Sequence, residues 1–279
     1  MQDLPAPDLE AIAARVTAAA AADERTSAAA ATFLLRQYLA TGSDQVRDAL
    51  GIVLAHALDD AAAASEVLDR AAWLSLFAEA VAVADDERVT GAMETLAAAL
   101  SAGWPSADGL RDGMASVDAC LRACAVVESL GLIPAAIDEL ERVVAAAYRP
   151  GAGLIDPASA APANSADHVR AASTLLTAFE LTGRLPYSML AEELVQVARR
   201  TVAADGDFAT QCETARALCR LAALHRRSDY RAAAVIADGA DYAADAERLL
   251  QAQALQLRAA STANAALYGL ALRELMPLR

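Results

Sequence analysis

The chain has 279 residues, of which 56% are hydrophobic and only 4% aromatic, and it is rich in alanine. Alanine has the highest helix propensity and suits close helix packing, whereas sheets favour branched and aromatic side chains, so we predict an all-α protein. The formal net charge of −14 repels phosphate backbones and anionic lipids. We therefore expect neither a nucleic acid nor a membrane as a partner.

The apolar periodicity predicts helices that follow one another in antiparallel pairs. A helix without a pair of its own comes first, over Asp8–Ala20, with Asp8 as its cap. Another such helix comes last, over Ser261–Leu275. Between them we predict five helical hairpins: Ser27–Ala40 with Asp44–Leu58, Arg70–Ala84 with Glu87–Leu100, Met114–Leu130 with Pro134–Tyr148, Asp167–Leu181 with Pro186–Val202, and Phe208–His225 with Asp229–Ala244.

Two longer segments interrupt the hairpins. Gly103–Gly113 is a predicted loop that contains Trp104 and Pro105. Arg149–Ala166 is rich in proline, glycine, alanine and serine, and we interpret it as a surface loop because the same hairpin unit resumes beyond it. We therefore predict one domain over residues 1–279.

The hairpins are copies of one unit. Tyr187 and Tyr230 occupy the same place in two copies and lie 43 residues apart, a repeat length typical of stacked helical hairpins. In each copy an apolar residue of the first helix is followed twelve residues later by an apolar residue of the second helix. The five pairs are Leu34 with Val46, Phe77 with Val89, Cys124 with Ala136, Leu175 with Tyr187, and Leu218 with Tyr230.

The two helices without a hairpin partner indicate whether the array of hairpins is open or closed. A helix with an apolar stripe must bury it, and the first helix can bury Leu9, Ile12 and Val16 against the last one. Together they make about a sixth hairpin, which closes the array into an α/α toroid. The alternative is an open α-solenoid, but open arrays usually end in polar capping repeats, and these terminal helices are apolar. We favour the closed ring.

The sequence predicts a cytoplasmic protein without a metal site. Met1–Glu10 carries acidic residues and two prolines in place of the basic start and apolar run of a secretory signal, and no later segment is apolar for ~20 residues. Cys120, Cys124, Cys212 and Cys219 lie inside alanine-rich helices, where we expect packing residues rather than zinc ligands or disulfides.

Three segments resemble the six-hairpin α/α toroid enzymes: Leu175–Gly183 (LLTAFELTG), Leu190–Ala198 (LAEELVQVA) and Cys212–Ala234 (CETARALCRLAALHRRSDYRAAA). They are most similar to the C-terminal toroid of the thioredoxin-domain-containing, spermatogenesis-associated family, and more distantly to N-acylglucosamine 2-epimerases and unsaturated glucuronyl hydrolases. The resemblance covers about Arg70–Leu275. It implies first helices that line a ring, with their N-terminal ends around a cleft.

The resemblance also implies which residues surround that cleft. Asp167 and Arg170 are three residues apart, and so are Glu213 and Arg216, so each pair shares a helix face. The residues expected at the mouth are Trp73, Trp104, Arg111, Asp112, Asp118, Asp167, His168, Arg170, Gln211, Glu213, Arg216, Ser261 and Asn264.

Three of these residues are candidate catalytic groups. Asp167 and His168 could move a proton, because a histidine titrates near neutrality and a carboxylate can tune it, although an aspartate at a helix N-terminus also serves as a cap. Glu213 lies in an alanine-rich helix and could act as an acid or base, although a Glu213–Arg216 pair also suits a solvated helix face.

Six further residues are candidate ligand contacts. Arginines suit a carboxylate or hydroxyl groups, and tryptophans stack on sugars, although tryptophans equally suit core packing. The six are Trp73, Trp104, Arg170, Gln211, Arg216 and Asn264. No glycine-rich phosphate loop, HExxH motif or nucleophile elbow occurs, so we predict no cofactor.

The sequence is compatible with two functions, and it does not decide whether the protein is an enzyme. The first is a ligand-binding or non-catalytic toroid with a polar central cleft, which the scarcity of histidine and aromatic residues favours. The alternative is a carbohydrate-active enzyme, an epimerase, isomerase or glycoside hydrolase acting on an anionic sugar. Positive helix N-termini favour a small anionic or sugar ligand in both cases. A homo-oligomer is left open.

Overall fold

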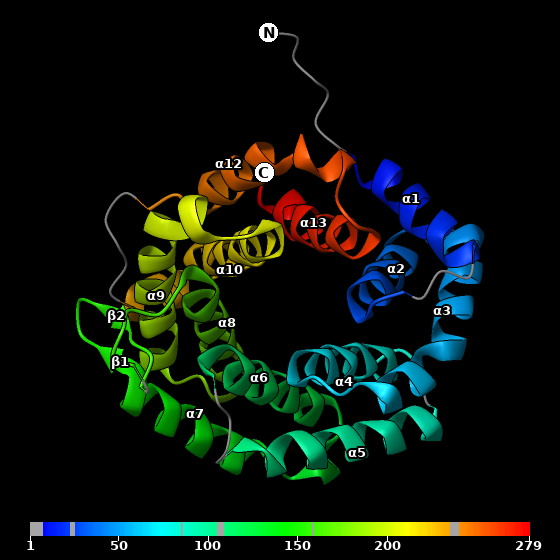
Figure 1. The fold of residues 1–279 in the computed structure, drawn as a ribbon. Helices are drawn as coiled ribbons and strands as arrows, with labels where there is room; N and C mark the ends of the chain where they lie inside the picture. The colour runs from blue at the N-terminus through cyan, green and yellow to red at the C-terminus, as the bar shows by residue number, and fades with distance from the viewer. Residues whose placement is uncertain (1–7, 23–25, 85, 105–108, 158, 235–239) are drawn as a thin grey trace, which may run out of the picture. The chain divides into compact units, whose positions relative to one another are not determined.

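The computed structural model of the chain describes residues 8–22, 26–84, 86–104, 109–157, 159–234 and 240–279, most of them in helices (Figure 1). These residues form two compact units. Unit 1 consists of Met1–Ala57, Asp207–Arg227 and Ala237–Arg279, and unit 2 consists of Leu58–Gly206 and Ser228–Ile236. Unit 1 thus joins segments from both ends of the sequence, whereas most of unit 2 is one continuous segment.

Unit 1 is built around the helix α13 (Thr262–Leu275). It packs against α1 (Leu9–Ala21), α2 (Ala28–Thr41) and α10 (Phe208–Arg226), and α12 (Tyr242–Gln253) packs against both α10 and α13. The helix α3 (Asp44–Ala63) begins in unit 1 and ends in unit 2.

The predicted pairing of the first and last helices is confirmed, since α1 packs against α13. Ile12 and Val16 of α1 are buried and Leu9 is half-buried. Arg15 of α1 adds hydrogen bonds to the carbonyl groups of Leu257, at 2.8 Å, and Ala260, which precede α13.

The helix ends in unit 1 follow from local sequence. Asp8, Ser27 and Ser261 each accept a hydrogen bond from the backbone N–H three residues later, which satisfies a donor that the first helical turn leaves unpaired. Gly42 ends α2 with a φ of 64°, a left-handed conformation that glycine adopts at low cost. These capping residues agree with the sequence-based boundaries.

Unit 2 consists of three further hairpins and a short helix. The first helices of the hairpins are α4 (Val67–Val81), α6 (Leu110–Val126) and α8 (Ser165–Thr182), and α6 packs against both of the others. Their second helices, α5 (Glu87–Ala102), α7 (Ile133–Ala147) and α9 (Leu185–Asp205), each pack against the first helix of the same hairpin. The short helix is α11 (Ser228–Ala233).

The segment 149–166, predicted as an irregular loop, holds a small β-hairpin. The strands β1 (Tyr148–Arg149) and β2 (Gly153–Leu154) pair antiparallel, with Tyr148 opposite Leu154. Gly151 and Gly153 have φ angles of 77° and 83°, which the tight turn requires and which other residues rarely adopt. Two-residue strands are too short for a periodic pattern to predict.

Several predicted helix boundaries are also wrong; for example, α4 runs from Val67 to Val81 rather than from Arg70 to Ala84, and α6 ends at Val126 rather than at Leu130. α6 starts at Leu110 rather than Met114, because Gly113 is buried within its first turn, where packing outweighs the low helix propensity of glycine. α3 continues to Ala63, five residues beyond the predicted end, because Ala61 is buried. The predicted helix 229–244 is instead α11 and α12, separated by a segment whose residues 235–239 lie outside the described part.

Each residue of the twelve-residue pattern lies in a helix. Nine of its ten residues are buried, and Val89 is half-buried. The twelve-residue repeat therefore identifies positions of the hydrophobic core. No helix in the described part of the chain is long and apolar enough to cross a bilayer.

Gly269 of α13 provides a test of the close packing in unit 1. A Cβ atom at this position would lie 2.5 Å from Cε2 of Phe33 and 3.1 Å from Cγ2 of Ile12. Phe33 is fully buried and has little room to move. We therefore expect Gly269→Ala to lower the free energy of unfolding by about 1–3 kcal/mol in urea denaturation, because the site is overpacked.

The matched control is Gly91→Ala, in the interior of α5. Gly91 is exposed, and a Cβ atom there would meet nothing within 4 Å. The higher helix propensity of alanine should raise stability by about 0.5–1 kcal/mol. Equal effects of the two substitutions would show that Gly269 does not set the spacing of α13, α1 and α2.

Candidate functional site

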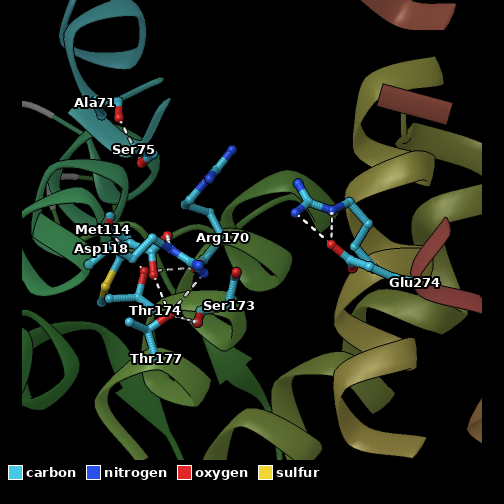
Figure 2. A network of polar contacts seen from close by, with 11 residues as sticks. Ala71, Ser75, Met114, Asp118, Arg170, Ser173, Thr174, Thr177 and Glu274 are labelled. Carbon is cyan, nitrogen blue, oxygen red and sulfur yellow. Dashed lines mark hydrogen bonds and ion pairs between the residues drawn. The ribbon is translucent and has the colours of Figure 1, made fainter. Parts of the chain in front are cut away.

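A polar network joins α6 and α8 in unit 2 (Figure 2). Asp118 is buried, and its Oδ2 accepts a hydrogen bond from Nε of Arg122 at 2.9 Å. Its Oδ1 accepts a second from Oγ1 of Thr177 at 2.5 Å. Arg122 also donates to Oγ1 of Thr177 at 3.0 Å. The buried carboxylate is thus paired with a cation and a hydroxyl group, as a buried charge must be.

Asp167, a predicted catalytic residue, lies in the first turn of α8. Its backbone N–H donates to Oδ1 of Asn164 at 2.9 Å, and its Oδ2 accepts from the backbone N–H of Asn164 at 3.3 Å. This reciprocal pair is a capping box. Burial raises the pKa of the Asp167 carboxyl, although the hydrogen bond from Asn164 and the charge of Arg111 act in the opposite direction. The capping role and the raised pKa coexist in one side chain.

His168 is buried and both of its ring nitrogens are hydrogen-bonded to the backbone. Nε2 accepts from the N–H of Leu154 at 3.0 Å, so Nδ1 carries the proton that it donates to the carbonyl of Asn164 at 2.8 Å. Gly153 lies so close to the imidazole ring that a Cβ atom at this position would be 2.6 Å from Nε2 of His168. The ring thus ties β2 to α8, and we leave His168 out of the proposed chemistry.

Arg111, near the start of α6, faces the Asp167 side of α8. It is half-buried, and its charge contributes to the pKa of Asp167. Its Nε is buried and has no hydrogen-bond partner in the described part of the chain. Arg170, labelled in Figure 2, follows Asp167 by three residues on α8. Of these two arginines, Arg111 is the one whose charge acts on the Asp167 carboxyl group.

The two tryptophans are core residues rather than exposed sugar-stacking surfaces. Trp73 is 6% exposed, and its ring lies 6.2 Å from that of Phe77, between centroids. Trp104 is also 6% exposed, and its Nε1 donates to Oγ of Ser116 at 2.8 Å. Because burial leaves neither ring a free face, we do not carry Trp73 and Trp104 into the proposed site.

Unit 1 holds a second charged cluster, around Glu274 of α13 (Figure 2). Its Oε1 accepts from Nη1 of Arg36 at 2.9 Å and from Nε and Nη2 of Arg216 at 3.0 and 2.8 Å. Burial would raise the pKa of Glu274, but the charges and hydrogen bonds of Arg216 and Arg36 outweigh it, so the pKa is lowered. Arg216 thus pairs with a glutamate 58 residues away in sequence.

Four more of the predicted residues lie in unit 1, and Asp112 lies in unit 2. Oε1 of Gln211 accepts a hydrogen bond from Nε2 of Gln253. Glu213 is half-buried on α10, and the backbone N–H of Asn264 donates to the cap Ser261 at 3.2 Å. Asp167 and Arg170 belong to unit 2, whereas Glu213 and Arg216 belong to unit 1. Their convergence on one cavity stays a prediction.

Sequence reasoning left Glu274, Arg36 and Arg122 out of the candidate site. The spacing of Asp118 and Arg122, four residues apart on one helix, was a usable signal for their ion pair. Nothing local could reveal the pairing of Arg36 with Glu274, which are 238 residues apart.

All four cysteines are free and buried. Burial raises the pKa of Cys120, Cys212 and Cys219 to about 12, and also raises that of Cys124. Within the described residues, no group of three or more histidine, cysteine, aspartate and glutamate side chains is arranged to hold a metal ion.

Solved structures with a similar fold are α-1,6-mannanases. The GH76A enzyme from Salegentibacter sp. HEL1_6 matches with a TM-score of 0.65 and 12% identity over 97% of this chain and 99% of that one. Two inactive variants of it, with two neighbouring aspartates replaced, match with TM-scores of 0.64 and 0.65 at 11% and 12% identity; each match covers 98% of this chain and 100% of the other. They were solved with α-1,6-mannotetrose and α-1,6-mannotriose.

The likeness to these structures gives the fold class. The chain is an α/α toroid, as the sequence predicted in preference to an open solenoid. No protein-family model matches the sequence, and no curated protein matches it either. At 11–12% identity the comparison speaks for the fold alone.

The burial of the cysteines predicts thiols that do not react in the folded protein. At pH 7.5 a thiol with a pKa of about 12 is almost wholly protonated, and the thiolate is the reactive form. Intact mass spectrometry should find no iodoacetamide adduct on the native chain and four adducts in urea. A Gln45→Cys variant, at an exposed position of α3, should take up one label without urea.

The lowered pKa of Glu274 predicts a loss of stability in acid. A carboxyl group whose pKa falls on folding stabilises the fold at pH values above its ordinary pKa of 4.5. This contribution is lost as the pH falls through the pKa of the folded state. Glu274→Gln should cost about 1–3 kcal/mol at pH 7, because Arg36 and Arg216 lose their charged acceptor. The variant should also lose less stability than the wild type between about pH 6 and 3.

Glu247→Gln is the control for this measurement, because Glu247 pairs with Arg279 at a more exposed position. Its acid titration, followed by urea denaturation at each pH, should match that of the wild type. If Glu274→Gln also follows the wild-type curve, the Glu274 pKa is not lowered in the fold.

Proposed function

We propose that this protein is a carbohydrate-active toroid protein that binds a saccharide with an acidic group and uses Asp167 to move a proton. The observation that carries the proposal is the half-buried carboxyl of Asp167, whose pKa is raised by burial and which lies near Arg111 at the starts of two packed helices. The similar structures support it at the level of fold, because they are mannanases.

The raised pKa suits Asp167 to the role of general acid. A group that protonates the leaving oxygen of a glycosidic bond must hold a proton at the working pH, which a raised pKa favours. A glycoside hydrolase needs a second carboxylate, as nucleophile or as base. Glu213, half-buried on α10, stays a catalytic residue predicted from the sequence.

The basic residues near Asp167 favour an acidic substrate. Arg111 and Arg170 can donate to a carboxylate, and the N-terminal ends of α6 and α8 add positive potential. Arg216, Gln211 and Asn264, which belong to unit 1, stay ligand contacts predicted from the sequence. The substrate class that fits is an oligosaccharide containing a uronic acid.

Mannan hydrolysis is not part of the proposal. In the similar mannanase, variants with two neighbouring aspartates replaced are inactive. The neighbouring aspartates of this chain are Asp59 with Asp60, on α3, and Asp86 with Asp85, which lies outside the described residues. Asp86 caps α5 and pairs with Arg88 at 2.8 Å. Asp59 and Asp60 lie on α3 and Asp86 caps α5, whereas Asp167 lies on α8.

The second candidate function is ligand binding without turnover. The burial of Trp73 and Trp104 favours it, because an enzyme acting on a sugar polymer commonly uses exposed aromatic rings as stacking platforms. The narrower likeness to the thioredoxin-domain-containing, spermatogenesis-associated family, and the cytoplasmic location, stay predictions.

The test compares Asp167→Asn with Asp167→Ala on oligosaccharides that contain a uronic acid and, as a neutral control, on α-1,6-mannooligosaccharides. The asparagine oxygen can still accept from Asn164, so Asp167→Asn should keep the capping box and melt near the wild-type temperature. Turnover, measured by release of reducing ends, should fall about 10²–10⁴-fold because the proton donor is gone.

Asp167→Ala separates capping from chemistry. It should lose turnover and also about 0.5–2 kcal/mol of stability, since the backbone N–H of Asn164 loses its acceptor. Turnover in Asp167→Asn equal to that of the wild type would refute the assignment. Binding measured by calorimetry, with no turnover of any saccharide by the wild type, would favour the second function.

A further inference from the structure

Arg273, in the last turn of α13, is a half-buried cation without an ion pair in the described part of the chain. Its Nη2 donates to Oε1 of Gln37, a buried amide on α2, and its Nε is buried without a hydrogen-bond partner among the described residues. Burial and the charge of Arg36 lower the pKa of Arg273. Its surroundings therefore disfavour the charge that it carries.

The carboxylate next in sequence does not compensate Arg273. Oε1 of Glu274 accepts from Arg36 and Arg216, and Oε2 is buried without a hydrogen-bond partner among the described residues. In the cluster of Arg36, Arg216, Arg273 and Glu274, the carboxylate thus accepts from Arg36 and Arg216 but not from Arg273. The cluster holds an unused donor on Arg273 and an unused acceptor on Glu274.

A structural role for Arg273 explains these features less well. An arginine in the last turn of a helix often stabilises the helix by binding its final carbonyl groups. The hydrogen bond of Arg273 instead reaches the side chain of Gln37 on a different helix. Leaving a cation half-buried and unpaired costs stability, unless something absent from the chain itself supplies the missing charge.

We propose that Arg36 and Arg273 bind an oxyanion of a small ligand, a carboxylate or a phosphate, and that Oε2 of Glu274 accepts a hydrogen bond from a hydroxyl group of the same ligand. A hydroxy acid such as a sugar acid, or a sugar phosphate, offers both groups. This site lies wholly in unit 1. The site does not include Asp167 and its binding is measured without turnover, so this proposal is tested independently of the function proposed above.

The charge of the whole protein does not oppose such a site. At physiological ionic strength the Debye length is about 8 Å, so most of the net charge of −14 is screened at the cluster. A hydrogen bond to a charged group contributes about 1.5–3 kcal/mol, which corresponds to about a 10- to 150-fold change in Kd. Loss of Arg273 should therefore be easy to detect by calorimetry.

The experiment titrates the full chain with sodium phosphate, sodium glucuronate and glucose by isothermal calorimetry, at an ionic strength fixed with sodium chloride. We expect phosphate and glucuronate to bind and glucose not to bind. Each binding anion should also raise Tm by several degrees at a hundredfold excess over Kd. Tighter binding of glucuronate than of phosphate supports the carboxylate source, and the reverse supports the phosphate source.

Arg273→Met is the decisive variant, because methionine keeps much of the apolar volume and removes the charge. It should bind the preferred anion at least tenfold more weakly, and in chloride alone its Tm should equal or exceed that of the wild type, since an uncompensated cation is gone. Arg47→Met is the control. Arg47 is exposed and already paired with Asp44 and Asp48, so this variant should bind like the wild type.

Three outcomes would overturn the proposal: neither anion binds more tightly than chloride, Arg273→Met binds as tightly as the wild type, or Arg273→Met lowers Tm in chloride with no change in Kd. The last result would assign Arg273 to the end of α13. The binding of phosphate by Arg273→Met is measured without any turnover, which keeps a failure of the proposed chemistry distinct from a failure of this site.

Discussion

The close approach of alanine-rich helices is the constraint on which the rest of this structure depends. Alanine side chains fill little space, which leaves few positions where a large ring fits between neighbouring helices. The large rings therefore occupy special places: Phe33 lies against Gly269, Trp73 against Phe77, and Phe179 against Tyr230. The same constraint limits which polar side chains the first helices can carry, since each must find its partner on an adjacent helix.

The sequence predicted the elements that arise from local and periodic signals. The caps Asp8, Ser27 and Ser261 and the stop at Gly42 follow from short-range chemistry, and the twelve-residue pattern follows from burial in the core. The toroid followed from two apolar helices that lacked partners. The β-hairpin and the start of α6 were missed because short strands have no period and because the burial of Gly113 depends on the tertiary structure.

The candidate site was predicted less well, because its contacts join distant parts of the sequence. The capping box of Asp167 could be inferred from Asn164 three residues earlier. The hydrogen bond between His168 and Leu154, the packing of Trp73 and the convergence of Arg36 and Arg216 on Glu274 depend on how the helices meet. Residue type and net charge do not contain that information, and a strongly acidic chain can hold a locally basic cluster.

The discontinuous composition of unit 1 has a consequence for the order in which the protein is made. The helix α1 is synthesised before its partner α13. Arg15 and Ala260, which form a hydrogen bond, are 245 residues apart in sequence. The long continuous segment of unit 2 can form its hairpins from local contacts while synthesis proceeds, since neighbouring hairpins close short loops. The neighbouring helix α2 can pack against α1 at once, but the face of α1 that α13 covers must wait for α13. Unit 1 therefore completes its packing only after the whole of unit 2 has been made.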